Sequence, residues 1–211
     1  MDNAPDLDTA ETTVEPQPLH GSAKLTGKDF EEVLLHRARQ YDEPAGLYCL
    51  NRYGVMAARI KGVWTPITSL PDFDMALPDG RQCCFDAKVC SQSSYDLIGG
   101  TSKSFKHQYV FLRRKARMSV LSFLLMHFNE RRLKTKVEPA GTYLFPVGDV
   151  PFWRAYDSGE QKHISRQDAA RYGIVVNWTL PTPRCMKLAP DLLAAVKQYR
   201  IWLVEQIGKA N

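Results

Sequence analysis

The chain has 211 residues, 44% of them hydrophobic, which is enough for one substantial core and too little for two large independent domains. No apolar run approaches the roughly 18 residues that span a bilayer, and the N-terminus lacks the basic-then-apolar order of a secretory signal. We therefore expect a soluble, cytoplasmic protein with no membrane partner. Five cysteines without CxxC spacing do not support a disulfide framework or a structural zinc site, and they favour reduced, mostly buried thiols.

Charge divides the chain into two parts. Residues 1–22 contain five acids and no Lys or Arg, and their few apolar side chains cannot offset the entropy of ordering. We expect a disordered acidic tail there and a single domain over residues 23–211. Without the tail's formal charge of −5, the net charge of +5 rises to +10 on this domain. Such a charge favours an anionic partner such as nucleic acid, although solubility alone would also account for it.

The first half of the domain predicts one helix followed by short strands. Thr26 can cap a helix over residues 27–41, with Asp29 completing a short capping box and Phe30 starting a helical apolar stripe; we expect the helix to end before Pro44. The following segments are rich in β-branched and aromatic residues interrupted by Gly and Pro, which is typical of strands and hairpins. Within them, residues 51–67 predict a plain hairpin.

The second half predicts a mixed α/β arrangement. Residues 104–117 form a basic amphipathic helix, and the apolar run at 119–128 is typical of a central strand covered on both faces. Further strands are expected at 142–147 and 173–178, and a short helix from Ser165 to Gly173. A last helix, 190–207, has Pro190 in its first turn and two apolar faces, which indicates deep packing or a partner.

The stretch LPDFDMALPDGRQCCFDAKVC, residues 70–90, carries the candidate chemistry. Strand alternation places Asp86 and Lys88 on one face, and a neighbouring strand would bring Asp72 beside them. Carboxylates are the ligands that Mg²⁺ or Mn²⁺ prefers, and the lysine would orient water or stabilise developing charge. Asp74 shares a face with Asp72 and is an alternative or extra ligand. The alternative structure is an edge strand with Asp86 and Lys88 in solvent.

Four segments also occur in a specific order, namely LTGKDFEEVL, the stretch above, FKHQYVFLRR and LSFLLMHFNERRLKT. In this order, over roughly residues 25–178, the chain resembles the RecU-like Holliday junction resolvases, also labelled penicillin-binding protein-related factor A. That family is a branch of the PD-(D/E)xK nuclease superfamily. The resemblance implies a restriction-endonuclease-like fold, a mixed sheet flanked by helices. It also implies a homodimer in DNA recombination and repair that cuts four-way DNA junctions symmetrically with Mg²⁺.

The resemblance also implies roles for individual residues. Asp72 and Asp86 take the places of the two metal-binding acids and Lys88 that of the catalytic lysine, while Glu31 matches a glutamate that holds the metal through its water shell. In the resembling proteins the pair matched by His107 and Gln108 lies close to the active site or its DNA, which implies a catalytic role for Gln108, and helical spacing suits an inward-facing Gln108. Residues 51–67 match a protruding stalk of that family, which implies a short stalk here as the alternative to a plain hairpin. Two features depart from the family pattern: no glycine follows Asp72 closely, and Phe111 replaces a second histidine. Contacts to DNA are expected from Lys103, Lys106, His107, Arg113, Arg114 and Arg117, with further basic residues at Lys115, Arg131, Arg132, Lys134 and Lys136.

Three functions are compatible with these observations. The first is a structure-selective endonuclease that resolves Holliday junctions with paired nicks, the second is another PD-(D/E)xK nicking or repair endonuclease that acts as a monomer, and the third is a non-catalytic DNA-binding recombination factor. The presence of Glu31, Asp72, Asp86 and Lys88 together favours an enzyme.

Overall fold

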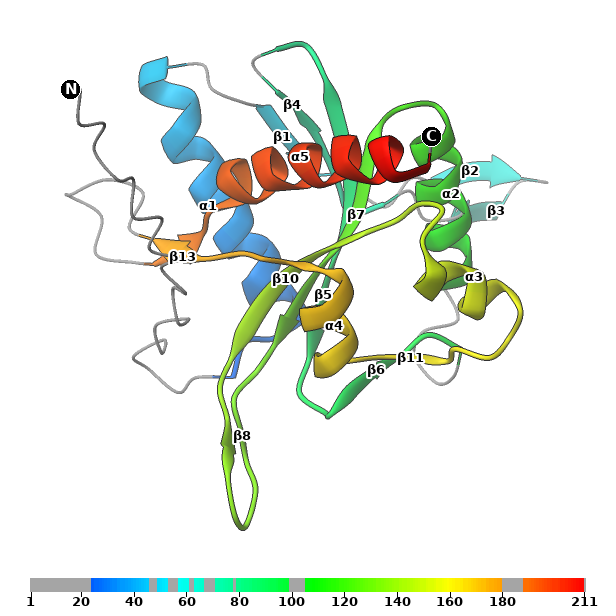
Figure 1. Ribbon diagram of the computed structural model, residues 1–211. Coiled ribbons are helices and arrows are strands. Elements are labelled where there is room, and N and C mark those ends of the chain that lie inside the picture. The colour runs from blue at the N-terminus through cyan, green and yellow to red at the C-terminus, as the bar shows by residue number, and fades with distance from the viewer. Residues whose placement is uncertain are drawn as a thin grey trace, which may run out of the picture.

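A mixed β-sheet runs through the computed structural model (Figure 1), which describes residues 24–45, 49–52, 57–60, 63–66, 71–77, 79–98, 105–179 and 188–210. The expected acidic tail lies outside these residues. The sheet has six strands in the order β1-β4-β5-β7-β10-β12. Their bounds are β1 Cys49–Arg52, β4 Phe73–Ala76, β5 Gln82–Cys90, β7 Leu121–Phe128, β10 Gly141–Pro146 and β12 Ile174–Val175.

Among the strands that the structure describes in this sheet, only the central pair is parallel. Strand β5 runs parallel to β7, and the other neighbours in the sheet are antiparallel. Parallel neighbours need a crossover connection, and the helix α2, Phe105–Arg117, supplies it between β5 and β7. This basic amphipathic helix has the bounds that the sequence predicted to within one residue.

Helices cover both faces of the sheet, so its central strands are buried on both sides. Alternate residues of β5 and β7, such as Phe85 and Phe123, pack with α1 (Gly27–Ala45) and α5 (Leu192–Ala210). The intervening residues, such as Cys84 and Leu124, pack with α2, α3 (Pro151–Asp157) and α4 (Arg166–Tyr172). All eight residues of β7 are buried, which confirms the predicted central strand.

Among the described residues, four small antiparallel pairs lie outside this sheet. They are β2 (Ala57–Ile60) with β3 (Val63–Pro66), β6 (Ser94–Asp96) with β11 (His163–Ser165), β8 (Arg131–Arg132) with β9 (Val137–Glu138), and β13 (Trp178–Thr179) with β14 (Ala189–Pro190). The pair β2–β3 falls within residues 51–67. The pair β8–β9 continues strands β7 and β10 into a hairpin that projects from the body of the protein (Figure 1).

Side chains define the helix starts. The Asp29 N–H donates to Thr26 Oγ1, and the Asp29 carboxylate accepts from the Thr26 N–H, as predicted for α1. The same reciprocal capping box joins Ser165 and Asp168 at α4. Each box satisfies N–H groups that have no partner within the helix.

Three expected boundaries were wrong. Helix α1 continues through Pro44 to Ala45, because a proline so close to a helix end removes few backbone hydrogen bonds. Helix α5 starts after Pro190, which belongs to β14; Asp191 is its cap and accepts the N–H of Ala194 at 3.1 Å. The single strand expected at 173–178 is split into β12 and β13, because β12 pairs with β10 whereas Trp178 and Thr179 pair with β14.

Candidate active site

The candidate site lies at the end of the β4–β5 pairing. Phe73 opposite Phe85 is the last register pair of this ladder, and beyond it side chains continue the pairing. The Asp72 N–H donates to Asp86 Oδ1 at 3.0 Å, and the Ala87 N–H donates to Asp72 Oδ2 at 3.0 Å. These reciprocal bonds hold the two carboxylates side by side, so the predicted convergence of Asp72 and Asp86 from adjacent strands is present.

Lys88 joins both carboxylates. Its Nζ lies 2.5 Å from Asp86 Oδ2 and 3.5 Å from Asp72 Oδ2. The Asp86 side chain is fully buried, whereas Lys88 and Asp72 keep 16% and 24% of their side-chain areas exposed. A ligand therefore reaches the group past Lys88 and Asp72. The alternative of an exposed edge strand was wrong, because β5 lies between β4 and β7 and Asp86 is inaccessible to solvent.

One oxygen of Asp86 is poorly satisfied. Oδ2 is buried and accepts no hydrogen bond of ordinary geometry within the described residues, although the Lys88 ammonium lies against it as an ion pair. Burial raises the pKa of the Asp86 carboxyl; Lys88 opposes this effect and Asp72 adds to it. Burial alone would lower the pKa of Lys88, but the two carboxylates together raise it above its usual range. Lys88 is therefore protonated, and it opposes without cancelling the effect of burial on Asp86, whose pKa is raised to about 7.

Tyr95 was not identified from the sequence as a neighbour of this group. It lies in β6 on the α2 side of the sheet, packed near Phe105. Burial raises the pKa of its phenol. Lys88 acts in the opposite direction and lowers this pKa, whereas Asp86 and Asp72 raise it further. No spacing in the sequence indicates this proximity, because β6 is placed by its pairing with β11, which is about seventy residues away in the chain.

Glu31 is not brought into a three-carboxylate group with Asp72 and Asp86. The described residues contain no group of three or more His, Cys, Asp or Glu side chains arranged to hold a metal ion. Glu31 lies on α1, and the buried residues of that helix pack against the sheet face opposite the one that carries Asp86. The role that the resemblance implies for Glu31 therefore stays a prediction. Asp74, in β4, pairs in register with Cys84, farther from Lys88 along β5.

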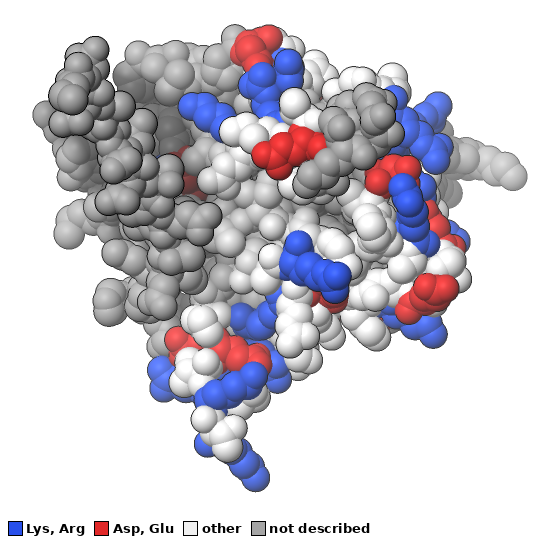
Figure 2. Space-filling view, viewed as in Figure 1, with Lys and Arg blue, Asp and Glu red and all other residues white. Residues whose placement is uncertain are grey.

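The residues expected on α2 divide into three groups. Gln108 is buried, as predicted, and its Oε1 accepts no hydrogen bond from the described residues. Arg113 is engaged within the protein, because it donates to the Tyr109 hydroxyl and pairs with Asp157. The remaining expected DNA contacts on α2 are exposed, namely Lys106, His107, Arg114 and Arg117, whereas Lys103 lies outside the described residues. On the face shown in Figure 2, basic and acidic side chains alternate in small groups.

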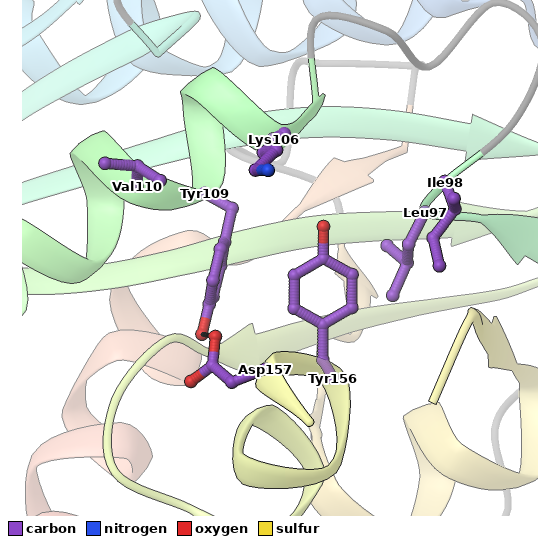
Figure 3. A pocket seen from close by; sticks show the side chains of 7 residues that line it. All are labelled: Leu97, Ile98, Lys106, Tyr109, Val110, Tyr156 and Asp157. Carbon is purple, nitrogen blue, oxygen red and sulfur yellow. Dashed lines mark hydrogen bonds between the residues drawn. The ribbon is translucent and has the colours of Figure 1, made fainter. Parts of the chain in front are cut away.

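A pocket of about 470 Å³ lies beside α2 (Figure 3). The Tyr109 hydroxyl donates to Asp157 Oδ1 at 3.1 Å on one side of it, and the Tyr156 ring projects from α3 on the other. The residues that line it are Leu97, Ile98, Lys106, Tyr109, Val110, Tyr156 and Asp157. Neither aspartate of the candidate site lines it, so this pocket is separate from the charged group.

A second buried polar cluster lies on the other face of the sheet. Thr142 Oγ1 accepts the Trp178 indole N–H at 2.7 Å and lies 2.8 Å from His127 Nδ1. Because the indole can only donate, the threonine proton is available to the imidazole. Burial lowers the pKa of His127 to about 4, so the ring is neutral at pH 7. Phe30 packs against the imidazole ring.

No protein-family model matches the chain, and no curated protein sequence matches it significantly. None of the described helices is long and apolar enough to cross a membrane.

The buried cysteines of β5 are accounted for by packing. Cys83, Cys84 and Cys90 are free thiols buried in the described part of the chain, and burial raises the pKa of Cys83 and of Cys84 to about 12. Thiols with such a pKa are poor nucleophiles at neutral pH, so the chemistry of β5 belongs to Asp86 and Lys88.

Proposed function

We propose that this protein is a metal-dependent DNA endonuclease of the PD-(D/E)xK type that resolves four-way junctions as a homodimer. The observation that carries the proposal is the contact of Asp72, Asp86 and Lys88 where β4 begins beside β5. This group is desolvated and charged, and an arrangement so costly for stability is typical of functional sites. A mixed sheet with helices on both faces is compatible with the restriction-endonuclease-like fold that the proposal requires.

The donor set fits a divalent ion. Asp72 and Asp86 would hold Mg²⁺ or Mn²⁺, since both ions prefer carboxylate oxygens and Asp86 Oδ2 lacks an ordinary hydrogen-bond donor. When bound, the ion would supply charge neutralisation at a phosphate and activation of water.

The chain's own residues would do the remaining work. The Ala87 N–H keeps the Asp72 carboxylate in place, and the Asp72 N–H does the same for Asp86, so neither acid needs to reorganise. Lys88, whose raised pKa keeps it protonated, would hold its positive charge beside the negative charge that develops on a cleaved phosphodiester. The exposed cations of α2 would bind neighbouring phosphates with little reading of sequence.

A nicking assay tests the proposal. The full-length protein is incubated with an end-labelled four-way junction and an equal-length duplex, in Mg²⁺ and in EDTA. Asp86→Asn tests the site, and Asp79→Asn is the matched control because it makes the same change at an exposed aspartate of the β4–β5 turn. We expect paired, symmetric nicks in the junction with the parent protein and the control, and none in EDTA or with Asp86→Asn.

The other outcomes separate the competing functions. Equal cutting of junction and duplex would retain the nuclease and remove junction selectivity. Tight junction binding without cleavage in Mg²⁺ or Mn²⁺ would favour the non-catalytic DNA-binding factor. The mass of the protein in solution at micromolar concentration tests the dimer, and a monomer that nicks DNA would indicate a nicking or repair endonuclease.

A further inference from the structure

The β8–β9 hairpin is built as an arm. Strands β7 and β10 pair up to Phe128 and Gly141, and the chain between them continues outward through β8 and β9 to a turn closed by the Leu133 N–H, which donates to the Lys136 carbonyl at 2.9 Å. At about 3.3 Å per residue, the turn lies roughly 20 Å beyond the end of β7. Figure 1 shows the hairpin projecting away from the sheet and helices.

The base of the hairpin is fixed to the body. The Arg166 guanidinium, from α4, donates to the carbonyls of Asn129 and Pro139 on the two strands and lies over the Phe128 ring. The Asn129 side chain donates to the Leu25 carbonyl and accepts the Leu25 N–H. An isolated two-stranded hairpin is marginally stable in water, so these contacts give the arm a defined direction.

The outer part of the hairpin is basic and exposed. Three of its cations have acidic partners: Arg131 and Lys136 pair with Glu138, and Arg132 pairs with Glu130. The side chains of Arg132 and Lys136 nevertheless remain 75% and 64% exposed. Lys134, at the turn, is exposed and forms no ion pair with another described residue. Blue side chains mark the projecting tip in Figure 2. The tip contributes nothing to the core, and its positive charge faces solvent.

The hairpin leaves the sheet at the end where the candidate site opens. In the parallel β5–β7 register, Lys88 lies opposite Met126 and Cys90 opposite Phe128, so the arm starts one strand away from Lys88 and about two residues beyond it. A polyanion lying against Asp72 and Lys88 would therefore pass the base of the arm.

We propose that the β8–β9 hairpin is a DNA-binding arm that enters the major groove of the duplex next to the cleaved position, with Lys134 and Lys136 at phosphates. This inference rests on the proposed function, since it requires DNA at the site. The major groove of B-DNA accommodates a two-stranded β-ribbon, and exposed lysines at the ribbon's turn are placed to contact the backbone on either side of the groove.

The test compares two variants that remove equal charge. Lys134→Gln/Lys136→Gln removes two positive charges from the arm, and Arg81→Gln/Lys197→Gln removes one from the β4–β5 turn and one from α5. Affinity for the four-way junction is measured in EDTA, which prevents cutting, over a series of salt concentrations. We expect the slope of log K against log salt to fall by about 2 for the arm variant and to stay unchanged for the control. Lys134→Gln alone, which disturbs no ion pair, should lower it by about 1.

Methylation of guanine N7 by dimethyl sulfate locates the arm, because N7 lies in the major groove. The parent protein and the control should protect guanines in the arm of the junction next to the nick, and the arm variant should lose this protection. Unchanged slope and protection in the arm variant, or an equal slope loss in the control, would overturn the inference while leaving the nuclease intact. Failure of the parent protein to bind any DNA would instead remove the proposed function and the inference with it.

Discussion

The sheet carries a buried polar cluster on each face, and the two clusters differ in how completely their groups are satisfied. On the α1 and α5 side, His127, Thr142 and Trp178 are neutral and bonded to one another. On the α2 side, the protonated Lys88 lies against Asp72 and Asp86, and one buried carboxylate oxygen has only an ion-pair contact. Satisfied neutral groups stabilise a fold at little cost. The charged cluster costs stability, and this difference is our reason for assigning function to one face and structure to the other.

The largest effect is expected from Lys88→Met, which leaves two adjacent carboxylates without their cation. Breaking a buried ion pair on one side should lower the free energy of unfolding by about 4 kcal/mol at pH 8. The loss should be smaller at pH 5. Burial raises the folded pKa of Asp86 above its unfolded value, so its protonation stabilises the fold at low pH and this contribution is lost as pH rises. Urea unfolding at both pH values measures it.

The control for that experiment is Lys197→Met, the same change at an exposed position of α5, which should alter stability by less than about 0.5 kcal/mol. If Lys88→Met were equally mild, the charged cluster would not depend on its lysine and the contrast between the two faces would disappear.

Thr142→Val tests the neutral cluster. The variant keeps the shape of the side chain but leaves the Trp178 indole N–H and His127 Nδ1 without a partner, so we expect a loss of about 3 kcal/mol in unfolding free energy. Junction nicking by the folded fraction should be unchanged, because the cluster lies on the face away from the candidate site. Thr135→Val, at the exposed turn of the hairpin, is the matched control for stability. A specific loss of nicking with Thr142→Val would contradict the structural role.

His127 should make stability depend on pH. Burial lowers its folded pKa to about 4, below the unfolded value of about 6.5. The unfolded chain therefore takes up a proton first as pH falls, so this contribution is complete above about pH 6.5 and is lost progressively toward pH 4. Between pH 7 and pH 5 the parent protein should lose about 2 kcal/mol from this group. Parallel pH series for the parent and His127→Gln measure it, and identical slopes would exclude the mechanism.

The smallest effect expected is stabilisation by metal, and it distinguishes Asp72 from Asp74. Mg²⁺ at ten times its dissociation constant should raise the free energy of unfolding by about 1.4 kcal/mol. The shift should persist in Asp74→Asn and vanish in Asp72→Asn and Asp86→Asn. Isothermal titration calorimetry gives the same comparison without any DNA. If Asp74→Asn lost the stabilisation by Mg²⁺ and Asp72→Asn kept it, the metal ligand would be Asp74 and not Asp72.

The parts of the fold that local pattern determines were predictable. The eight apolar residues of β7 indicated a strand buried on both faces, and the Ser165 and Asp168 pair indicated a capped helix. Helix α3 was not predicted, because its seven residues are too few to show a helical period, although Pro151 at its first turn was a usable signal. The β8–β9 hairpin was not predicted either, since its polar residues face solvent on both sides and show no alternation.

The candidate site was predictable to the extent that it is local. Asp86 and Lys88 share a face because of the two-residue period of a strand, which the sequence shows directly. The pairing of Arg113 with Asp157 was not foreseeable, because the partner lies 44 residues away in the chain on α3. Arg113 is therefore a poorer candidate for DNA contact than its position in a run of basic residues suggested.

The three charged residues of the site all come from one β-hairpin of neighbouring strands. The contacts between Asp72 and β5 join residues only 14 and 15 positions apart, so closing this loop costs little entropy and the group can form early in folding. Because the two strands are joined by a short turn, the site is also sensitive to the length of that turn. The turn between β4 and β5 closes through Leu77 and Arg81, and a single residue inserted there would shift the register by one and turn Asp72 to the opposite face from Asp86. The length of the β4–β5 turn, which contributes no side chain to the charged group, thus sets whether the two carboxylates meet.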